Sequence, residues 1–165
     1  MIDSPVLQFR DLILDAATRE GLSPSILAGL IETESSGDPY AIRIERGFWR
    51  RYYQGIVRLF RGNNPKRLSK WMRFPDLIAA SYGLCQIMLP VAVEYGFDAR
   101  FPTTLLDPET NIDLGATILA RHIARHGGDR NAGLLRYNGG GDAGYPARVL
   151  AASVKFREAL GDKTT

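Results

Sequence analysis

The sequence reads Ile31-Glu32-Thr33-Glu34-Ser35-Ser36-Gly37-Asp38-Pro39 at the point that decides the fold. This stretch closes a segment that begins with Ser23, a preferred helix N-cap, and with Pro24, which fits the first helical turn. Gly37 and Pro39 are residues at which helices commonly stop. The spacing predicts a helix that begins at Pro24 and ends within the quoted stretch, with two glutamates near its end.

Glu34 and Glu32 fall on opposite faces of this helix. On a helical wheel of about 100° per residue, Glu34 lies in the middle of an apolar face and Glu32 lies on the solvent side. The apolar face consists of Leu27, Leu30 and Ile31. Apolar neighbours raise the pKa of a carboxyl group, and a protonated acid at neutral pH is what cleavage of a glycosidic bond requires. Glu34 is thus the candidate catalytic acid, although an isolated glutamate near a helix end is more often a cap or an ion-pair partner.

The composition narrows the class of protein. The chain has 165 residues, of which 45% are apolar and 24% charged, and this fits one compact domain. Its net charge of +3 is compatible with an anionic cell-wall polymer or with nucleic acid. Cys85 is the only cysteine, which excludes an internal disulfide. No stretch has the roughly 20 apolar residues of a membrane span, and the first residues lack the features of a signal peptide. No zinc-ligand spacing or nucleotide-binding motif occurs, and we expect neither a metal nor a cofactor.

Apolar residues recur at three- and four-residue spacing almost throughout the chain, while alternating runs are scarce. The pattern predicts an all-α fold. Besides the helix that carries Glu34, the expected helices cover about 6–19, 49–60, 84–95 with an interruption at Pro90, 107–128, 129–138 and 145–160, with a further short helix before residue 75.

Four separated segments of the chain follow one another in the order seen in a known family. They are Glu34-Ser35 with Pro39 and Ala41; Ser81-Tyr82-Gly83-Leu84-Cys85-Gln86-Ile87-Met88; Leu106-Asp107-Pro108-Glu109-Thr110-Asn111-Ile112 with Gly115; and Leu134-Leu135-Arg136-Tyr137-Asn138-Gly139-Gly140 with Tyr145 and Val149. Together they resemble the soluble-type lytic transglycosylases (SLT domain), which share the fold of goose-type lysozyme. The resemblance implies a lysozyme-like all-α domain with an active-site cleft between a main helical lobe and a smaller lobe. The long segment between Glu34 and Gly83 is similar to bacteriophage-encoded members.

The resemblance also implies an activity. Members of this family cleave the β-1,4 bond between N-acetylmuramic acid and N-acetylglucosamine in peptidoglycan and form a 1,6-anhydro sugar, with one glutamate acting as general acid and then as base; Glu34 matches it. Tyr137 is expected to donate a hydrogen bond to Glu34 or to stack near a sugar. The matching segments assign substrate binding to Ser35, Gln86, Met88, Tyr137, Asn138 and Tyr145.

Two alternatives remain open. A muramidase would hydrolyse the same bond and would use a second carboxylate across the cleft, for which Glu45 and Asp76 are the candidates. A protein of another class, a non-catalytic cell-wall-binding or virion structural module, would keep the fold without activity. The expected site of action is the cell wall, on the periplasmic or extracellular side. The expected partners are peptidoglycan strands and, for delivery without a signal peptide, other virion proteins, a holin or cell-envelope proteins.

Residues 43–75 form a basic and aromatic block, which we interpret as an insertion within a single domain of residues 1–165. Ten Lys or Arg occur from Arg43 to Arg73 against one acid, Glu45. The interleaved aromatic residues are Phe48, Trp49, Tyr52, Tyr53, Phe60 and Trp71. The block is expected either to pack as an amphipathic helix pair on the main lobe or to form a wall of the glycan cleft. Nucleic-acid binding is the interpretation that we favour least, and we expect no nucleic-acid partner.

Overall fold

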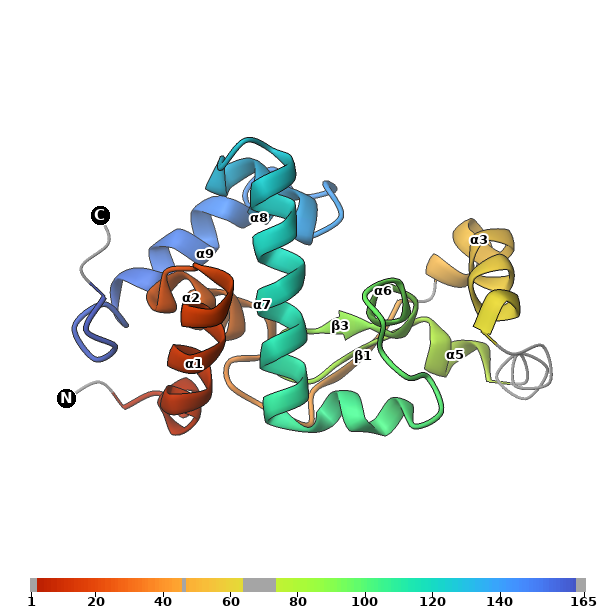
Figure 1. Cartoon of the computed structure of the whole chain (residues 1–165), viewed down its shortest axis with the longest axis horizontal. Coiled ribbons are helices and arrows are strands. Elements are labelled where there is room, and N and C mark those ends of the chain that lie inside the picture. Colours follow the sequence, from red (N-terminus) through yellow and green to blue (C-terminus); the bar gives the residue numbers. More distant parts are fainter. Residues whose placement is uncertain (1–2, 46, 64–73, 163–165) are drawn as a thin grey trace.

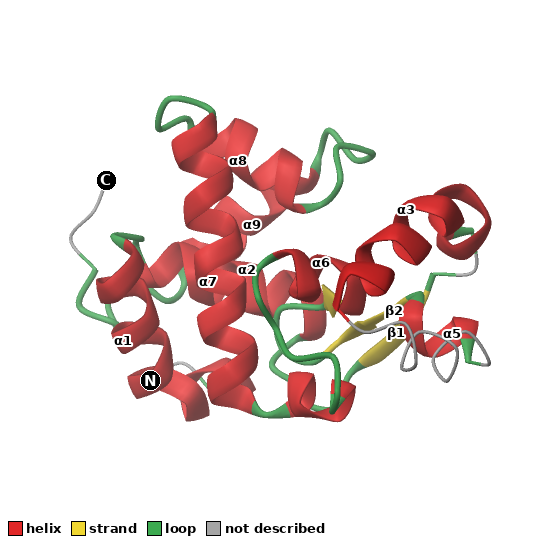
Figure 2. Cartoon of the chain, turned by 45° about the vertical axis from the view of Figure 1, so that its right-hand side comes forward, coloured by secondary structure: helices red, strands yellow, loops and turns green. Residues whose placement is uncertain are grey.

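The structure, a computed structural model, describes residues 3–45, 47–63 and 74–162. The helices are η1 (Pro5–Phe9), α1 (Arg10–Glu20), α2 (Pro24–Ser35), α3 (Phe48–Asn63), α5 (Pro75–Ile78), α6 (Leu89–Glu94), η2 (Pro102–Leu106), α7 (Pro108–Arg125), α8 (Arg130–Tyr137) and α9 (Tyr145–Val154), where η marks a 3-10 helix. The strands are β1 (Ile42–Ile44), β2 (Ala80–Tyr82) and β3 (Ile87–Met88). Figure 1 shows α1, α2 and α9 on one side of α7 and the sheet, α3, α5 and α6 on the other, with α8 at the upper end of α7. In the view of Figure 2, the sheet lies beside α3, α5 and α6, and α1 and α8 lie away from it.

Side-chain caps begin three of the helices at the predicted residues. The Ser23 hydroxyl accepts a hydrogen bond from the backbone N–H of Ile26 at 3.3 Å, at the start of α2. In the same way, an Asp107 carboxylate oxygen accepts from the N–H of Thr110 at 2.9 Å, at the start of α7. Asp129 caps α8 by accepting from the N–H of Ala132. Each cap satisfies a backbone donor that has no partner within its helix, so these three boundaries follow from local chemistry.

Other boundaries differ from the sequence-based predictions. The helix expected over 84–95 with an interruption at Pro90 is wrong in its first half, because a turn and β3 occupy that half and Pro90 lies in the first turn of α6. The first predicted helix is divided into η1 and α1, and α9 ends at Val154 rather than near residue 160. The predicted helix over 49–60 lies within α3. The further short helix expected before residue 75 lies outside the described residues.

A small antiparallel sheet adds to the predicted all-helical pattern. The strand order is β1-β2-β3, with Ile42 opposite Tyr82 and Ser81 opposite Met88. Its strands have two or three residues, which is too short for apolar alternation to reveal them in the sequence. β2 is buried throughout and β1 is exposed throughout, so the sheet packs against the core through its middle strand. The described part of the chain is otherwise mainly helical, and the predicted fold class is confirmed.

The close packing of α2 on α9 brings the end of α2 to the site. Gly29 lies in α2, and a Cβ atom added to it would come within 2.5 Å of the Val149 carbonyl oxygen and 2.8 Å of the Ser153 backbone nitrogen. The two helix backbones therefore approach closely only because residue 29 has no side chain. Leu27, Leu30 and Ile31 are fully buried in the common core, which orients the C-terminal turn of α2 toward the start of α9.

Candidate active site

Glu34 lies in the last turn of α2, where the apolar face of that helix reaches the edge of the core. Its side chain is half-buried, as the wheel predicts. The hydroxyl of Tyr145, at the start of α9, donates a hydrogen bond to Glu34 Oε1 at 2.6 Å. Tyr145 itself is only 2% exposed, so its ring is part of the core while its hydroxyl reaches the carboxylate. The packing of α2 on α9 thus creates this contact between residues 111 positions apart.

Opposing influences act on the pKa of Glu34. Burial raises this pKa above the ordinary glutamate value, and it is the largest influence. The hydrogen bond from Tyr145 and the positive charges of Arg43 and Arg148 lower it in part, and the negative charge of Glu45 raises it. Burial also raises the pKa of the Tyr145 hydroxyl, which keeps that group a hydrogen-bond donor. The Glu34 carboxyl group therefore keeps its proton to a higher pH than an ordinary glutamate does. After it loses that proton, Tyr145, Arg43 and Arg148 stabilise the carboxylate.

Glu32 takes part in a different set of contacts. Its carboxylate accepts hydrogen bonds from the Ser4 hydroxyl at 3.2 Å and from the Lys155 ammonium group, with which it forms an ion pair. The Glu32 side chain is 24% exposed and pairs with an exposed lysine, so Glu32 lies on a partly exposed side of α2. The contacts of Glu32 tie α2 to the N-terminal segment and to the end of α9. This structural role is consistent with the choice of Glu34 as the candidate acid.

Ser35 binds a neighbouring loop. Its hydroxyl contacts the Leu84 carbonyl oxygen at 2.8 Å and the Ile31 carbonyl oxygen at 3.2 Å, and it accepts from the backbone N–H of Gly37 at 3.3 Å. A sequence-predicted substrate contact is therefore engaged within the protein. The bond to Leu84 holds the loop between β2 and β3 against the end of α2, beside Glu34.

Gln86 stabilises the same loop from its other end. Its side-chain amide donates hydrogen bonds to the carbonyl oxygens of Gly83 at 2.9 Å and Ala41 at 3.1 Å. Gln86 has a φ of 48°, in the left-handed region that non-glycine residues rarely adopt. Such a conformation persists only where the surroundings hold it, and the two hydrogen bonds do so. Gln86 thus connects the turn after β2 to the segment that follows Glu34.

Tyr137 does not donate its hydrogen bond to Glu34. Its hydroxyl donates to the Cys85 carbonyl oxygen at 2.8 Å, so the predicted Tyr137–Glu34 hydrogen bond is wrong and Tyr145 occupies that place. Cys85 is fully buried, and burial raises the pKa of its thiol, which keeps it in the unreactive protonated form. Tyr137 therefore supports the loop behind the site.

The remaining predicted site residues are two substrate contacts, Met88 and Asn138, and two candidate second carboxylates, Glu45 and Asp76. Met88 is half-buried in β3, and Asn138 is half-buried at the C-cap of α8. Glu45 follows β1 and forms an ion pair with Arg43, whose Nε donates to Glu45 Oε1 at 2.7 Å. Asp76 is exposed in the first turn of α5. Of these two carboxylates, Glu45 is the one whose charge affects the pKa of Glu34.

Asn111 is a structural residue to which the sequence analysis assigned no role. Its side chain is fully buried in α7 and makes three hydrogen bonds: from the Cys85 N–H at 2.7 Å, to the Tyr82 carbonyl at 2.9 Å and to the Leu105 carbonyl at 2.7 Å. A buried asparagine among apolar residues near the start of a helix is a signal that was available, because buried amides need partners. Asn111 fixes the backbone of the loop on which Ser35, Gln86 and Tyr137 converge.

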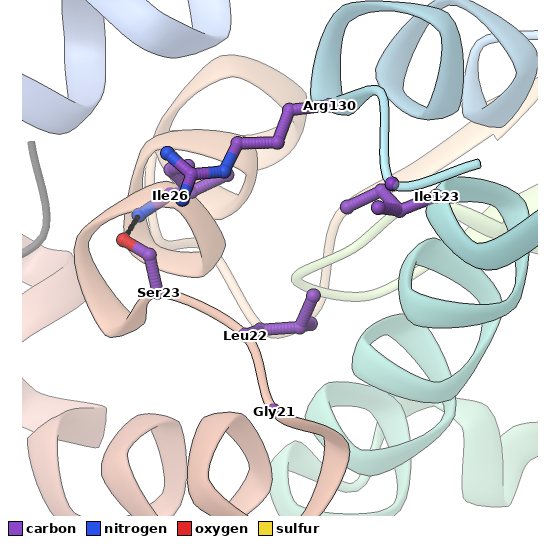
Figure 3. A pocket seen from close by; sticks show the side chains of 7 residues that line it. Gly21, Leu22, Ser23, Ile26, Ile123 and Arg130 are labelled. Carbon is purple, nitrogen blue, oxygen red and sulfur yellow. Dashed lines mark hydrogen bonds between the residues drawn. The ribbon is translucent and has the colours of Figure 1, made fainter. Parts of the chain in front are cut away.

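A cavity of about 310 Å³ lies away from Glu34, at the N-terminal end of α2 (Figure 3). Ile26 lines the cavity and precedes Glu34 by eight residues of α2, so the two lie roughly 12 Å apart along the helix axis, at 1.5 Å per residue. The Arg130 side chain extends across it toward α2, and the capping hydrogen bond from Ile26 to Ser23 lies at its edge. Its lining residues are Gly21, Leu22, Ser23, Ile26, Ile123, Gly128 and Arg130, a set that contains none of the predicted site residues.

The described residues offer neither a metal site nor a membrane span. Within residues 3–45, 47–63 and 74–162, no group of three or more His, Cys, Asp or Glu side chains is arranged to hold a metal ion. No helix in this part of the chain combines the length and the apolar content needed to span a bilayer.

The mainly helical architecture, the small sheet and the half-buried glutamate at the end of a core helix define a lysozyme-like domain. The chain belongs to the Transglycosylase SLT domain family, whose sequence model matches residues 11–148. A protein named Transglycosylase from Enterobacteria phage PRD1 is 28% identical to it over 155 residues, which is 89% of this chain and 43% of that protein. The chain therefore spans less than half the length of this relative. No solved structure matches the chain. The family and the similarity to a phage-encoded member, both predicted from the sequence, are confirmed.

Proposed function

We propose that this domain is a peptidoglycan lytic transglycosylase, and that Glu34 is its catalytic acid and base. The substrate is the β-1,4 bond between N-acetylmuramic acid and N-acetylglucosamine, and the product carries a 1,6-anhydromuramic acid end. The observation that supports this proposal most strongly is the position of Glu34 in the core-facing turn of α2, with burial raising its pKa and the Tyr145 hydroxyl 2.6 Å from its carboxylate. Membership in the SLT family agrees with it.

In the first step, protonated Glu34 gives its proton to the oxygen of the glycosidic bond. The bond between that oxygen and C1 of muramic acid breaks, and the N-acetylglucosamine unit leaves with a free 4-hydroxyl group. A raised pKa serves this step because it extends the protonated form of Glu34 to higher pH. Positive charge develops on the sugar ring as the bond breaks, and the new Glu34 carboxylate lies ready to stabilise it.

In the second step, the Glu34 carboxylate takes the proton of the muramoyl 6-hydroxyl group. The oxygen of that group attacks C1 of the same sugar, which closes the 1,6-anhydro ring and returns Glu34 to its acid form without consuming water. Tyr145, Arg43 and Arg148 favour the charged form of Glu34, so they stabilise the carboxylate between the two steps. One carboxyl group with partners for both of its forms is sufficient for this cycle.

Hydrolysis of the same bond is the second candidate, and one observation favours it. The charge of Glu45 acts on Glu34, which places a carboxylate near the site. A water molecule activated by Glu45 would give a reducing muramic acid end. Against this role, the Glu45 carboxylate is engaged with Arg43, and Asp76 is exposed on α5 and is not among the charges that influence the pKa of Glu34. We therefore favour the single-carboxylate cycle.

The remaining site residues receive more limited roles. The loop between β2 and β3 is held by hydrogen bonds from the side chains of Ser35, Gln86 and Tyr137. We therefore assign these side chains to support of the site rather than to direct sugar contacts. Asn138 and Met88 are half-buried and keep a proposed role in substrate contact.

The site of action that follows is the cell wall. The relative from phage PRD1 is named a transglycosylase, and a phage enzyme acting on the wall is consistent with this similarity. Delivery with other virion or cell-envelope proteins remains a proposal.

A zymogram of purified peptidoglycan tests the enzyme assignment. We expect wild-type protein to clear the gel, and Glu34→Gln to lose activity by at least about 10²-fold, because general acid catalysis contributes at least that much. Glu45→Gln is the matched control and should keep most of the clearing. Equal clearing by Glu34→Gln and wild type would instead support a catalytic role for another residue, and absence of clearing by both would favour a non-catalytic cell-wall-binding module.

A further inference from the structure

An ion pair near the start of α9 lies beside the tyrosine that contacts the candidate acid. Arg148 and Asp142 interact through both guanidinium Nη atoms, with Nη1 at 3.4 Å from Asp142 Oδ1 and Nη2 on Oδ2. Asp142 also accepts the backbone N–H of Gly144 at its Oδ1 and that of Tyr145 at its carbonyl oxygen. One residue therefore anchors the glycine-rich segment 138–144, the first turn of α9 and the guanidinium group together.

The guanidinium group lies beside the tyrosine that contacts Glu34. Arg148 follows Tyr145 by three residues, so the two side chains share one face of α9. The Arg148 Cζ atom lies 5.9 Å from the centre of the Tyr145 ring, within the range of a cation–π contact. The ring in turn places its hydroxyl 2.6 Å from Glu34 Oε1. A continuous set of contacts thus runs from Asp142 through Arg148 and Tyr145 to Glu34.

This geometry differs from that of an ordinary surface ion pair. An exposed pair alone contributes little to stability, and the Arg148 and Asp142 side chains are 54% and 43% exposed. The Arg100–Asp98 pair has nearly the same exposure, 52% and 49%, but lies in the segment between α6 and η2. The Arg148 pair differs because Arg148 contacts the buried ring of Tyr145, whose hydroxyl donates a hydrogen bond to Glu34. Arg100→Met is therefore a matched control.

We propose that Asp142 and Arg148 are positioning residues: Asp142 fixes the guanidinium group against the ring of Tyr145, and this contact holds the tyrosine hydroxyl on Glu34 during cleavage. The inference rests on the proposed function of Glu34. Several groups face Glu34 or interact with it electrostatically. Tyr145 and Arg148 belong to α9, Arg43 belongs to β1, and Glu45 follows β1. Cys85 lies in the loop after β2, and Tyr137 lies in α8. Arg148 is the cation among them that also contacts the Tyr145 ring.

The first test does not depend on activity. The carboxyl carbon of Glu34 is followed by NMR titration of protein labelled with ¹³C at glutamate side chains, with Glu34→Gln used to assign its signal. Removal of the Arg148 charge should move the titration midpoint to higher pH in Arg148→Met, because a nearby cation favours the carboxylate. Arg148→Lys keeps the charge and should move the midpoint less than Arg148→Met does, and Arg100→Met should leave it unchanged. A midpoint for Arg148→Met identical to that of wild type would overturn the proposal.

The second test separates position from charge. Release of soluble fragments from purified peptidoglycan is measured as a function of pH for the same variants and for Asp142→Asn. We expect Arg148→Lys and Asp142→Asn to cleave about tenfold more slowly than wild type, since small misplacements of a catalytic group are costly. Arg148→Met should also lose rate, with its alkaline limb at higher pH. Full activity of both Arg148→Lys and Asp142→Asn would contradict a positioning role.

Failure of this inference can be distinguished from failure of the proposed function. If wild-type protein cleaves peptidoglycan and Arg148→Met has the wild-type titration and pH profile, the positioning role is wrong while the function stands. If wild-type protein releases no fragments, the proposed function fails, and the proposal for Arg148 fails with it. Asp142→Asn and Arg148→Lys are surface substitutions, so they serve as folded variants should Arg148→Met not fold.

Discussion

The proposed cycle makes two conflicting demands on Glu34. The group must hold a proton as a general acid, and it must then be stable as a carboxylate before it acts as a base. Burial raises the pKa of Glu34, which favours the protonated form, and the Tyr145 hydroxyl and the charges of Arg43 and Arg148 favour the carboxylate. These influences come from α9 and β1, which meet Glu34 from different parts of the chain.

Removal of the Tyr145 hydroxyl should change both the rate and its pH dependence. Tyr145→Phe loses a hydrogen bond to a charged group, which contributes about 1.5–3 kcal/mol, so cleavage should fall roughly 10- to 100-fold. The pKa of Glu34 should rise further because the bond favours the carboxylate, and the alkaline limb of the rate profile should move to higher pH. Tyr137→Phe is the control: its hydroxyl binds Cys85, so that variant should leave the alkaline limb in place.

Neutralisation of Glu34 should stabilise the protein as it abolishes activity. Because the folded-state pKa of Glu34 is raised, the folded state binds more protons than the unfolded state between the ordinary glutamate pKa and the raised value. Stability from this group is present at low pH and is lost as pH rises through that window. Glu34→Gln avoids this loss, so its Tm should match that of wild type below about pH 4 and exceed it increasingly as pH rises through that window. A Tm difference that does not vary with pH would argue against a raised pKa.

At the scale of elements, the packing of α2 on α9 determines whether Glu34 meets Tyr145. Gly29→Ala places a Cβ atom within 2.5 Å of the Val149 carbonyl oxygen, so the helices must separate. We expect a loss of about 1–3 kcal/mol in unfolding free energy and reduced cleavage. Gly55→Ala is the matched control, since nothing lies within 4 Å of the added Cβ atom in α3 and stability should rise by roughly 0.5–1 kcal/mol. Urea denaturation compares the two variants, and equal stabilities would refute the close approach.

The loop between β2 and β3 depends on Asn111 in α7. Asn111→Ala leaves a buried N–H and two buried carbonyl groups without their partner, at about 1–3 kcal/mol for each unsatisfied group. We expect a loss of at least about 3 kcal/mol in unfolding free energy by urea titration. Asn131→Ala, an exposed change in α8, should stay within about 0.5 kcal/mol of wild type. A small effect of Asn111→Ala would mean that water replaces the amide.

Which of these elements the sequence could reveal depends on the range of the interactions that form them. The caps at Ser23, Asp107 and Asp129 bind groups three residues away, so the sequence predicts them. The position of Glu34 on its helix is equally local. The sheet joins residues 42–44 to residues 80–82, and no local pattern encodes that pairing. The choice of Tyr145 over Tyr137 also depends on long-range packing, because both tyrosines occupy motif positions and only the α2–α9 approach distinguishes them.

At the scale of the whole molecule, the chain has a helical part and a smaller part that joins the sheet to α3, α5 and α6 (Figure 2). Glu34 lies at the end of α2, directly before the segment that leads to β1 and the smaller part. The proposed function predicts that the glycan strand binds beside this turn of α2. In α3 the described arginines, Arg50, Arg51 and Arg58, are exposed, which leaves positive charge free to face an anionic wall polymer.

The identity of the sugar end is the most direct test of the proposed chemistry. Purified peptidoglycan is digested with wild-type protein, with Glu34→Gln and without protein, and the fragments are analysed by mass spectrometry. We predict 1,6-anhydromuramic acid ends in the wild-type digest and only background fragments with Glu34→Gln. Reducing muramic acid ends in the wild-type digest, or anhydro ends formed equally well by Glu34→Gln, would contradict a transglycosylase that uses Glu34 as its single acid and base.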